Sequence, residues 1–210
     1  LVSDWSSDVC SSDLFMIKFF TYFLQSIIIY IFFILGKIMG ITLSRKFFSY
    51  LFLGGFMKGH PDMIAILNQL LTNEITAGNQ FILHSRMIKN WGLESLGKKE
   101  YDASMEEMVH ADKVIQRILF LEGVPNVQKI DRISIGLKIK DIIEADLKHE
   151  IKALDDLKGF IKKAEELEDY GSRELFMEIY KCEEEHIDWL ETQLELIERL
   201  GEQNYMQSQM

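Results

Sequence analysis

The chain has 210 residues and a formal net charge of −10, so it is long enough for a domain with a substantial hydrophobic core. The acidic balance argues against a nucleic-acid partner, which would need a basic face, and suits a protein that attracts cations. The two cysteines, Cys10 and Cys182, have neither the spacing of a disulfide framework nor that of a zinc site. We therefore expect the protein to be cytoplasmic.

The first quarter of the chain differs in composition from the rest. Ten of the 14 phenylalanines lie between residues 15 and 56, and residues 19–36 form an uncharged run of 18 residues. On hydropathy alone this run is a candidate transmembrane helix. It is too long for a signal peptide and lacks a small-residue cleavage site. Taken literally, the pattern describes a membrane anchor.

The same segment also has the features of translated non-coding DNA. Residues 4–14 (DWSSDVCSSDL) resemble one reading frame of a sequencing-adapter oligonucleotide, and residues 15–56 resemble translated AT-rich DNA. We therefore predict that residues 1–56 are a non-native leader and that the native protein begins at Met57. A membrane partner is expected only if residues 15–56 are genuine, and the intact mass of the native protein tests this.

From Met57 onward the sequence predicts four long helices. Pro61 suits a first helical position, and apolar residues recur at three- and four-residue steps to about residue 90. After Gly92 a second helix is predicted over 93–121, followed by a long connection over 122–137. A third helix is predicted over 138–168, and a fourth over 173–200 with Ser172 as its N-cap and Gly201 as its stop.

This pattern predicts an all-α fold. Residues 202–210 are expected to add a short C-terminal helix, and no segment shows the alternation of a strand. Two short links and one long crossover between the second and third helices describe the connectivity of a ferritin-like four-helix bundle. We therefore predict that residues 57–210 are one ferritin-like domain.

Two Glu-x-x-His motifs mark the second and fourth predicted helices. Glu107 and His110 form the first motif, and Glu183 and His186 form the second. Residues three apart on a helix point in directions about 60° apart, so each motif presents a carboxylate and an imidazole on one face. One such motif in an acidic helix is more often a solvated face than a metal site.

Two further carboxylates complete the pattern. Glu74 and Glu150 lie among apolar residues in the first and third predicted helices. Buried carboxylates need pairing or metal coordination, and four carboxylates with two imidazoles from four helices are the ligand set of a di-iron centre. The oxygen-rich set favours iron or manganese over structural zinc.

The pattern also predicts how the six side chains divide between two metal ions. We expect one ion to be held by Glu74 and His110 and the other by Glu150 and His186. Glu107 and Glu183 are expected to bridge the two ions. Two Fe(II) ions held close together can each give an electron to dioxygen or peroxide, which is ferroxidase chemistry.

From Met57 to the end, the chain closely resembles bacterioferritins. The resemblance rests on specific motifs: MKG at 57–59, NE at 73–74, LHSRM at 83–87, KNWGL at 89–93, EMVHAD at 107–112, RILFLEG at 117–123, EEEHIDWLET at 183–192 and QNY at 203–205. It implies that the six residues named above bind a di-iron centre. It also implies iron storage as ferric mineral in a hollow homo-oligomeric cage of twenty-four subunits.

The resemblance further implies a haem b group at a two-fold dimer interface. Met108 of each subunit would be an axial haem ligand, and the pocket would be lined by Ile75, Asn79, Ile82 and Met105. From the residues alone, packing of Met108 at a dimer interface is an equally good interpretation.

Several positions depart from the family pattern or stand outside the site. Phe81 replaces a tyrosine that many bacterioferritins carry near the iron centre. Asp102 replaces a histidine of an inner-surface iron site and, with Glu106, is expected to bind iron more weakly. We expect Cys182 to be a packed thiol. The histidines predicted to be structural or surface residues are His60, His84 and His149.

Three alternatives to an iron-storage ferroxidase stay open at this stage. They are a haem-binding shell subunit that co-assembles with a second ferritin subunit, a di-iron oxidase acting on an organic substrate, and a di-iron peroxidase without storage. The first would lack centre ligands, and a rubrerythrin-like peroxidase would need a Cys-x-x-Cys module, which this sequence does not contain.

Overall fold

The computed structural model describes residues 58–210, and these residues are almost entirely helical. The helices are α3 (Pro61–Asn90), α4 (Glu94–Phe120), α5 (Ile139–Glu166), α6 (Tyr170–Leu200) and α7 (Glu202–Ser208). No strand occurs in this part of the chain, and none of its helices combines the length and the apolar character needed to cross a membrane. The predictions for residues 1–56 and for the start at Met57 lie outside the described residues.

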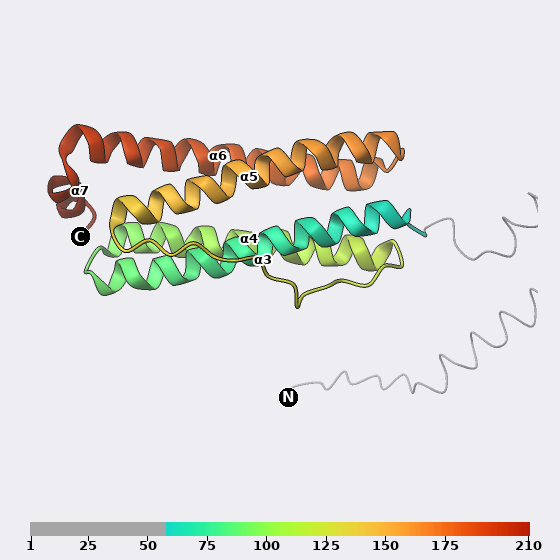
Figure 1. The fold of residues 1–210 in the computed structure, drawn as a ribbon, viewed down its shortest axis with the longest axis horizontal. Helices are drawn as coiled ribbons and strands as arrows, with labels where there is room; N and C mark the ends of the chain where they lie inside the picture. The colour runs from blue at the N-terminus through green and yellow to red at the C-terminus, as the bar shows by residue number, and fades with distance from the viewer. Residues whose placement is uncertain (1–57) are drawn as a thin grey trace, which may run out of the picture. The chain divides into compact units, whose positions relative to one another are not determined.

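The four long helices form the predicted bundle. α3 and α4 pair as one hairpin, α5 and α6 pair as the other, and the hairpins meet through α3 with α5 and α4 with α6. The crossover runs back along the bundle between the end of α4 and the start of α5, and α7 folds at the end of α6 (Figure 1). The all-α, ferritin-like fold with one long crossover is therefore confirmed.

Local sequence signals set most helix ends as predicted. Pro61 occupies the start of α3, and the His60 ring Nδ1 accepts the backbone N–H of Asp62 at 3.2 Å. α6 ends where Gly201 adopts a φ of 77°, a left-handed conformation that glycine tolerates without strain.

The start of α6 corrects one prediction. Ser172 is not the N-cap, because α6 begins at Tyr170 and the Asp169 side chain accepts the Ser172 backbone N–H at 3.0 Å. Arg117 of α4 reaches this end, donating from Nη2 to Asp169 at 2.5 Å and from Nε to the Ser172 hydroxyl at 2.9 Å. The observed cap lies three residues upstream of the predicted one, and its contacts with Arg117 also join α6 to α4.

A row of polar side chains on α3 holds the crossover against the bundle. Three backbone N–H groups donate to it: Asp131 to Thr76 Oγ1 at 3.0 Å, Ser134 to Gln80 Oε1 at 2.7 Å, and Gly136 to His84 Nε2 at 3.3 Å. A Cβ at Gly136 would lie 2.3 Å from the Ile142 backbone nitrogen, so the close approach requires glycine.

The apolar core is interrupted along the length of α3. One large apolar cluster includes Met63, Leu67, Leu70 and Leu71 near the start of α3, and another includes Ile88 near its end. Between them α3 contributes only Ala77 and Phe81 to a small third cluster. The buried side chains between them are largely polar and include Glu74, Thr76, Gln80 and His84. Apolar packing at both ends therefore encloses a polar middle.

Candidate metal centre

The six residues predicted as metal ligands meet in this polar middle. Glu74 comes from α3, Glu107 and His110 come from α4, Glu150 comes from α5, and Glu183 and His186 come from α6. The four carboxylates and His110 are buried, and the side chain of His186 is 10% exposed. The bundle thus brings one carboxylate from each helix and both imidazoles to one place.

The first group of converging ligand atoms is centred on His110. Atoms of Glu74, Glu107, His110 and Glu183 lie within 4.8 Å of one another. His110 Nδ1 is 3.3 Å from Glu74 Oε2, 3.7 Å from Glu107 Oε2 and 3.9 Å from Glu183 Oε1. None of these contacts has hydrogen-bonding geometry. One imidazole nitrogen therefore faces three carboxylates without a directional bond to any.

The second group is centred on His186. Atoms of Glu107, Glu150, Glu183 and His186 lie within 4.8 Å of one another, and His186 Nδ1 is 3.6 Å from Glu150 Oε1. Glu107 and Glu183 belong to both groups, whereas Glu74 and Glu150 each belong to one. This sharing is the arrangement expected for two bridging and two terminal carboxylates.

Burial shapes the protonation of the carboxylates. It raises the pKa values of Glu74, Glu150 and Glu183 well above their ordinary range, and repulsion from neighbouring carboxylates raises them further. Without a cation, this pocket therefore holds protons that carboxylates at the surface would release.

The two histidines respond to the site in opposite directions. Burial by itself lowers the pKa of His110, but attraction to Glu107 and Glu74 outweighs burial and raises that pKa to about 12. The contacts are too poorly aligned for hydrogen bonds, so we attribute the effect to ion pairing. Burial lowers the pKa of His186. One ring is charged and the other neutral near neutral pH.

Unpartnered buried atoms test whether the site fits a metal. Five buried side-chain atoms of the six residues have no hydrogen-bond partner: Glu74 Oε2, His110 Nδ1, Glu150 Oε1, Glu183 Oε2 and His186 Nε2. Orphaned buried polar atoms are costly, and a pair of cations would satisfy the carboxylate oxygens among them. The atoms that would bind the metal are carboxylate oxygens and imidazole nitrogens, which suit iron better than structural zinc.

Aromatic rings surround the second histidine. The Phe81 ring meets the His186 ring edge-on, with 5.3 Å between the two ring centroids. The centroid of the Trp189 ring is 6.2 Å from that of His186. Phe81 thus lies beside the candidate centre, as expected from the resemblance. Its ring carries no hydroxyl, so it supplies neither a hydrogen bond nor a phenol to the site.

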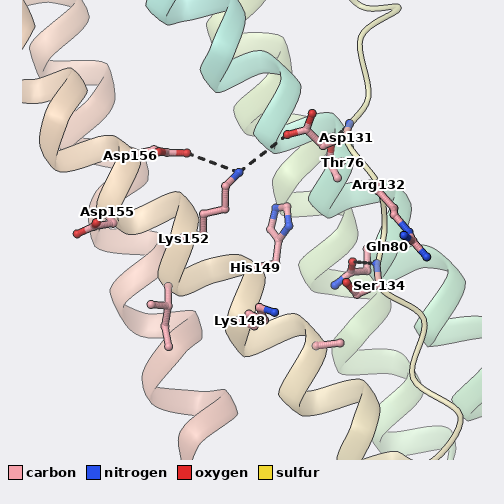
Figure 2. A pocket seen from close by; sticks show the side chains of 12 residues that line it. Thr76, Gln80, Asp131, Arg132, Ser134, Lys148, His149, Lys152, Asp155 and Asp156 are labelled. Atoms are coloured by element: carbon pink, nitrogen blue, oxygen red, sulfur yellow. Dashed lines mark hydrogen bonds and ion pairs between the residues drawn. The ribbon is translucent and has the colours of Figure 1, made fainter.

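A pocket of about 760 Å³ lies between the crossover and α5. It is lined by charges of both signs, with Lys152 between Asp131 and Asp156 at 3.9 Å from each (Figure 2). His149 also lines it, and the His149 ring meets Phe81 edge-on at 6.3 Å. The Phe81 ring therefore neighbours both His149, which lines the pocket, and His186.

The surroundings of Met108 fit the outward position predicted for it. Met108 is half-buried, and a Cβ added to Gly78 of α3 would lie 2.3 Å from the Met108 methyl carbon. Gly78 therefore makes room for this side chain. Ile75 and Ile82 of α3 are half-buried and Asn79 is exposed, as is Met105 on α4. Haem ligation by Met108 and its packing at a dimer interface both stay predictions.

Other predictions have mixed outcomes. Asp102 is exposed and pairs with Lys98, so the structure does not join it to Glu106. His84 is structural, since its ring Nδ1 donates to the Asp146 carboxylate at 2.8 Å within the buried core. His60 is exposed at the start of α3.

Two buried acids, Asp146 and Glu100, were not predicted from the sequence, and Glu100 is the one without a partner. Glu100 is fully buried and neither of its oxygens has a partner, and burial, followed by repulsion from Asp146, raises its pKa well above the ordinary range. Its sequence neighbours Lys98, Lys99 and Asp102 suggest a solvated face. Only the approach of the other helices buries it.

Comparisons with known proteins agree with this geometry. Residues 64–200 match the ferritin-like domain family. The chain is 47% identical over 151 residues to the bacterioferritin of Brucella melitensis, covering 72% of this chain and 94% of that protein. It is 46% identical over 149 residues to the bacterioferritin of Mycobacterium bovis (71% and 94% covered).

A third relative is nearly as similar. The bacterial ferritin of Synechocystis is 42% identical over 155 residues, covering 73% of this chain and 99% of that protein. The matched part coincides with the four-helix bundle and includes all six converging side chains. From this agreement in sequence and in fold, the chain belongs to the bacterioferritin family of ferritin-like proteins.

Proposed function

We propose that this protein stores iron and oxidises Fe(II) to Fe(III) at a di-iron centre within each chain. The observation that carries the proposal is that two four-residue groups of buried ligand atoms share Glu107 and Glu183. Shared carboxylates place two cations next to each other, which a two-electron reaction with one oxidant requires. The proposed ligands are Glu74, Glu107, His110, Glu150, Glu183 and His186.

Iron is the substrate of this site, and its binding must displace protons. With the pKa of His110 raised to about 12, the ring carries a proton that must leave before Nδ1 can bind a cation. Protons held by the buried carboxyl groups of Glu150 and Glu183 must leave as well. Each bound Fe(II) then gives one electron to dioxygen or peroxide, and the Fe(III) passes to the mineral.

The same chain is proposed to assemble into a hollow homo-oligomeric cage in the cytoplasm, with haem b at a two-fold interface. Membership of the bacterioferritin family supports this assembly, and the half-buried Met108 beside Gly78 supports the axial ligand. A shell subunit that only binds haem would lack part of the centre. All six centre residues are present here, which favours the ferroxidase.

Aerobic addition of Fe(II) to the purified protein tests the proposal. The wild-type protein should oxidise Fe(II) rapidly. Its molecular size shows whether the cage has assembled, and its visible spectrum shows whether haem is bound. Glu183→Ala should slow the fast oxidation by about 100-fold or more, since it removes a shared ligand. Glu185→Ala, an exposed neighbour on the same helix, is the matched control and should match wild type. Equal rates for Glu183→Ala and wild type would remove the catalytic assignment.

A further inference from the structure

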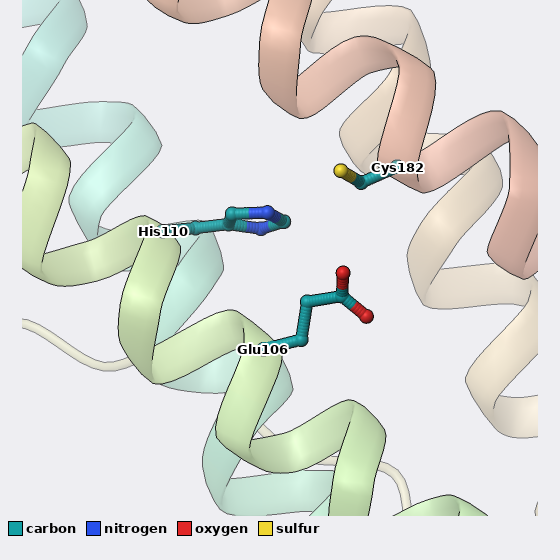
Figure 3. Close-up of side chains that lie close together, drawn as sticks. All are labelled: Glu106, His110 and Cys182. Carbon is teal, nitrogen blue, oxygen red and sulfur yellow. The ribbon is translucent and has the colours of Figure 1, made fainter.

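A third group of possible metal ligands lies beside the candidate di-iron centre. We call Glu106, His110 and Cys182 the thiol cluster; one ligand atom from each lies within 4.8 Å of the others. Glu106 and His110 extend from α4 and Cys182 extends from α6, and the three side chains point towards one another (Figure 3). The cluster thus bridges two helices that belong to different hairpins.

The exposure of the three side chains increases from His110 to Cys182 to Glu106, so the thiol cluster is open to solvent on one side. His110 is buried, Cys182 is half-buried and free, and Glu106 is exposed. Two ligands are therefore held by packing, while the third reaches in from the solvent side. The sequence prediction that Cys182 is only a packed thiol does not account for this convergence.

The ligand chemistry of the thiol cluster differs from that of the six-residue centre. A thiolate is a soft ligand, and a set of one thiolate, one imidazole and one carboxylate with an open fourth position suits zinc rather than iron. In a tetrahedral zinc site neighbouring ligand atoms lie about 3.5 Å apart, from metal–ligand distances of about 2.0–2.3 Å. The exposed Glu106 side chain is free to move the small distance that this geometry needs.

We propose that Glu106, His110 and Cys182 form a binding site for a divalent metal of the zinc type, with solvent in the fourth position. His110 also belongs to the first group of the candidate di-iron centre. The two candidate sites therefore share this imidazole. The binding site itself does not depend on the proposed iron oxidation.

Anaerobic titration of the full chain with Co²⁺ tests the site. Cobalt replaces zinc, and cobalt bound to a thiolate shows a near-ultraviolet sulfur-to-metal charge-transfer band that oxygen and nitrogen ligands do not give. We expect this band in wild type and in Cys10→Ser, and its loss in Cys182→Ser. Glu106→Gln and His110→Ala should each weaken the binding at least about tenfold. Added Zn²⁺ should abolish the band.

The variants keep the test independent of iron chemistry. Circular dichroism and molecular size establish that Cys182→Ser is folded, and the exchange of sulfur for oxygen at a half-buried position changes little volume. A wild-type protein without the band at saturating cobalt would overturn the proposal, as would a band that survives in Cys182→Ser. Either result would leave the proposed ferroxidase untouched, because the reaction is measured with Fe(II) in a separate assay.

Discussion

The α3–α4 hairpin and the α5–α6 hairpin contribute the same residue types to the centre but give them different surroundings. Each supplies one carboxylate and one Glu-x-x-His motif. His110 of the first hairpin faces three carboxylates within 3.9 Å, whereas His186 of the second has the rings of Phe81 and Trp189 as neighbours. Identical motifs therefore acquire different electrostatic properties.

The hairpins also differ at the residue after each motif's glutamate. Met108 follows Glu107 and lies against Gly78, while the exposed Glu184 follows Glu183. The first hairpin thus offers an apolar sulfur side chain where the second offers only a charge. The repeated motif therefore determines which atoms can bind a metal. The packing around each copy determines the charge of its histidine and any additional role of its neighbouring residues.

The largest effect is expected from removing either imidazole. His110→Ala and His186→Ala should each lose one of two bound metal ions and slow fast Fe(II) oxidation by about 100-fold or more. Anaerobic Fe(II) binding and stopped-flow oxidation measure the two quantities. His60→Ala, which alters an exposed histidine, is the control. Two metal ions retained in either variant would contradict the division into two half-sites.

The next effect concerns the first hairpin alone. Met108→Leu should eliminate haem while leaving Fe(II) oxidation within about twofold of wild type, because leucine keeps the apolar volume but lacks the sulfur. The visible spectrum reports the haem. The control Met177→Leu replaces a half-buried methionine of α6, and this variant should keep its haem. Haem absorbance that persists in Met108→Leu would place the axial ligand elsewhere.

The smallest effect is a difference in how His110 and His186 contribute to folding stability as the pH changes in the metal-free protein. The pKa of His110 is raised from 6.5 to about 12, so its stabilisation is complete below pH 6.5 and is lost as the pH rises towards 12. The pKa of His186 is lowered, so its contribution is present above pH 6.5 and is lost as the pH falls through the lowered value.

Urea unfolding of His110→Gln and His186→Gln across this range measures both contributions. Relative to wild type, the cost of His110→Gln should shrink above pH 6.5 by at most about 1.4 kcal/mol per pH unit. The cost of His186→Gln should shrink below pH 6.5 instead. Parallel curves for the two variants would show that the rings do not differ in charge.

The sequence by itself determined the helices and the identity of the six converging side chains. Apolar residues at three- and four-residue steps define helix faces locally, and the Glu-x-x-His spacing places Glu107 beside His110 whatever the neighbours are. Pro61 and Gly201 act through their own backbone preferences, so their positions were also predictable. The lengths of the links between the predicted helices then indicated how the four helices connect.

Only the tertiary structure decided the properties that depend on atoms from several helices. Arg117 of another helix binds the Asp169 cap of α6, and Glu100 is buried although its sequence neighbours are charged. The opposite pKa shifts of the two histidines and the approach of Cys182 to His110 arise in the same way. Desolvation and Coulomb interactions depend on distances between helices, and no spacing within one helix encodes these distances.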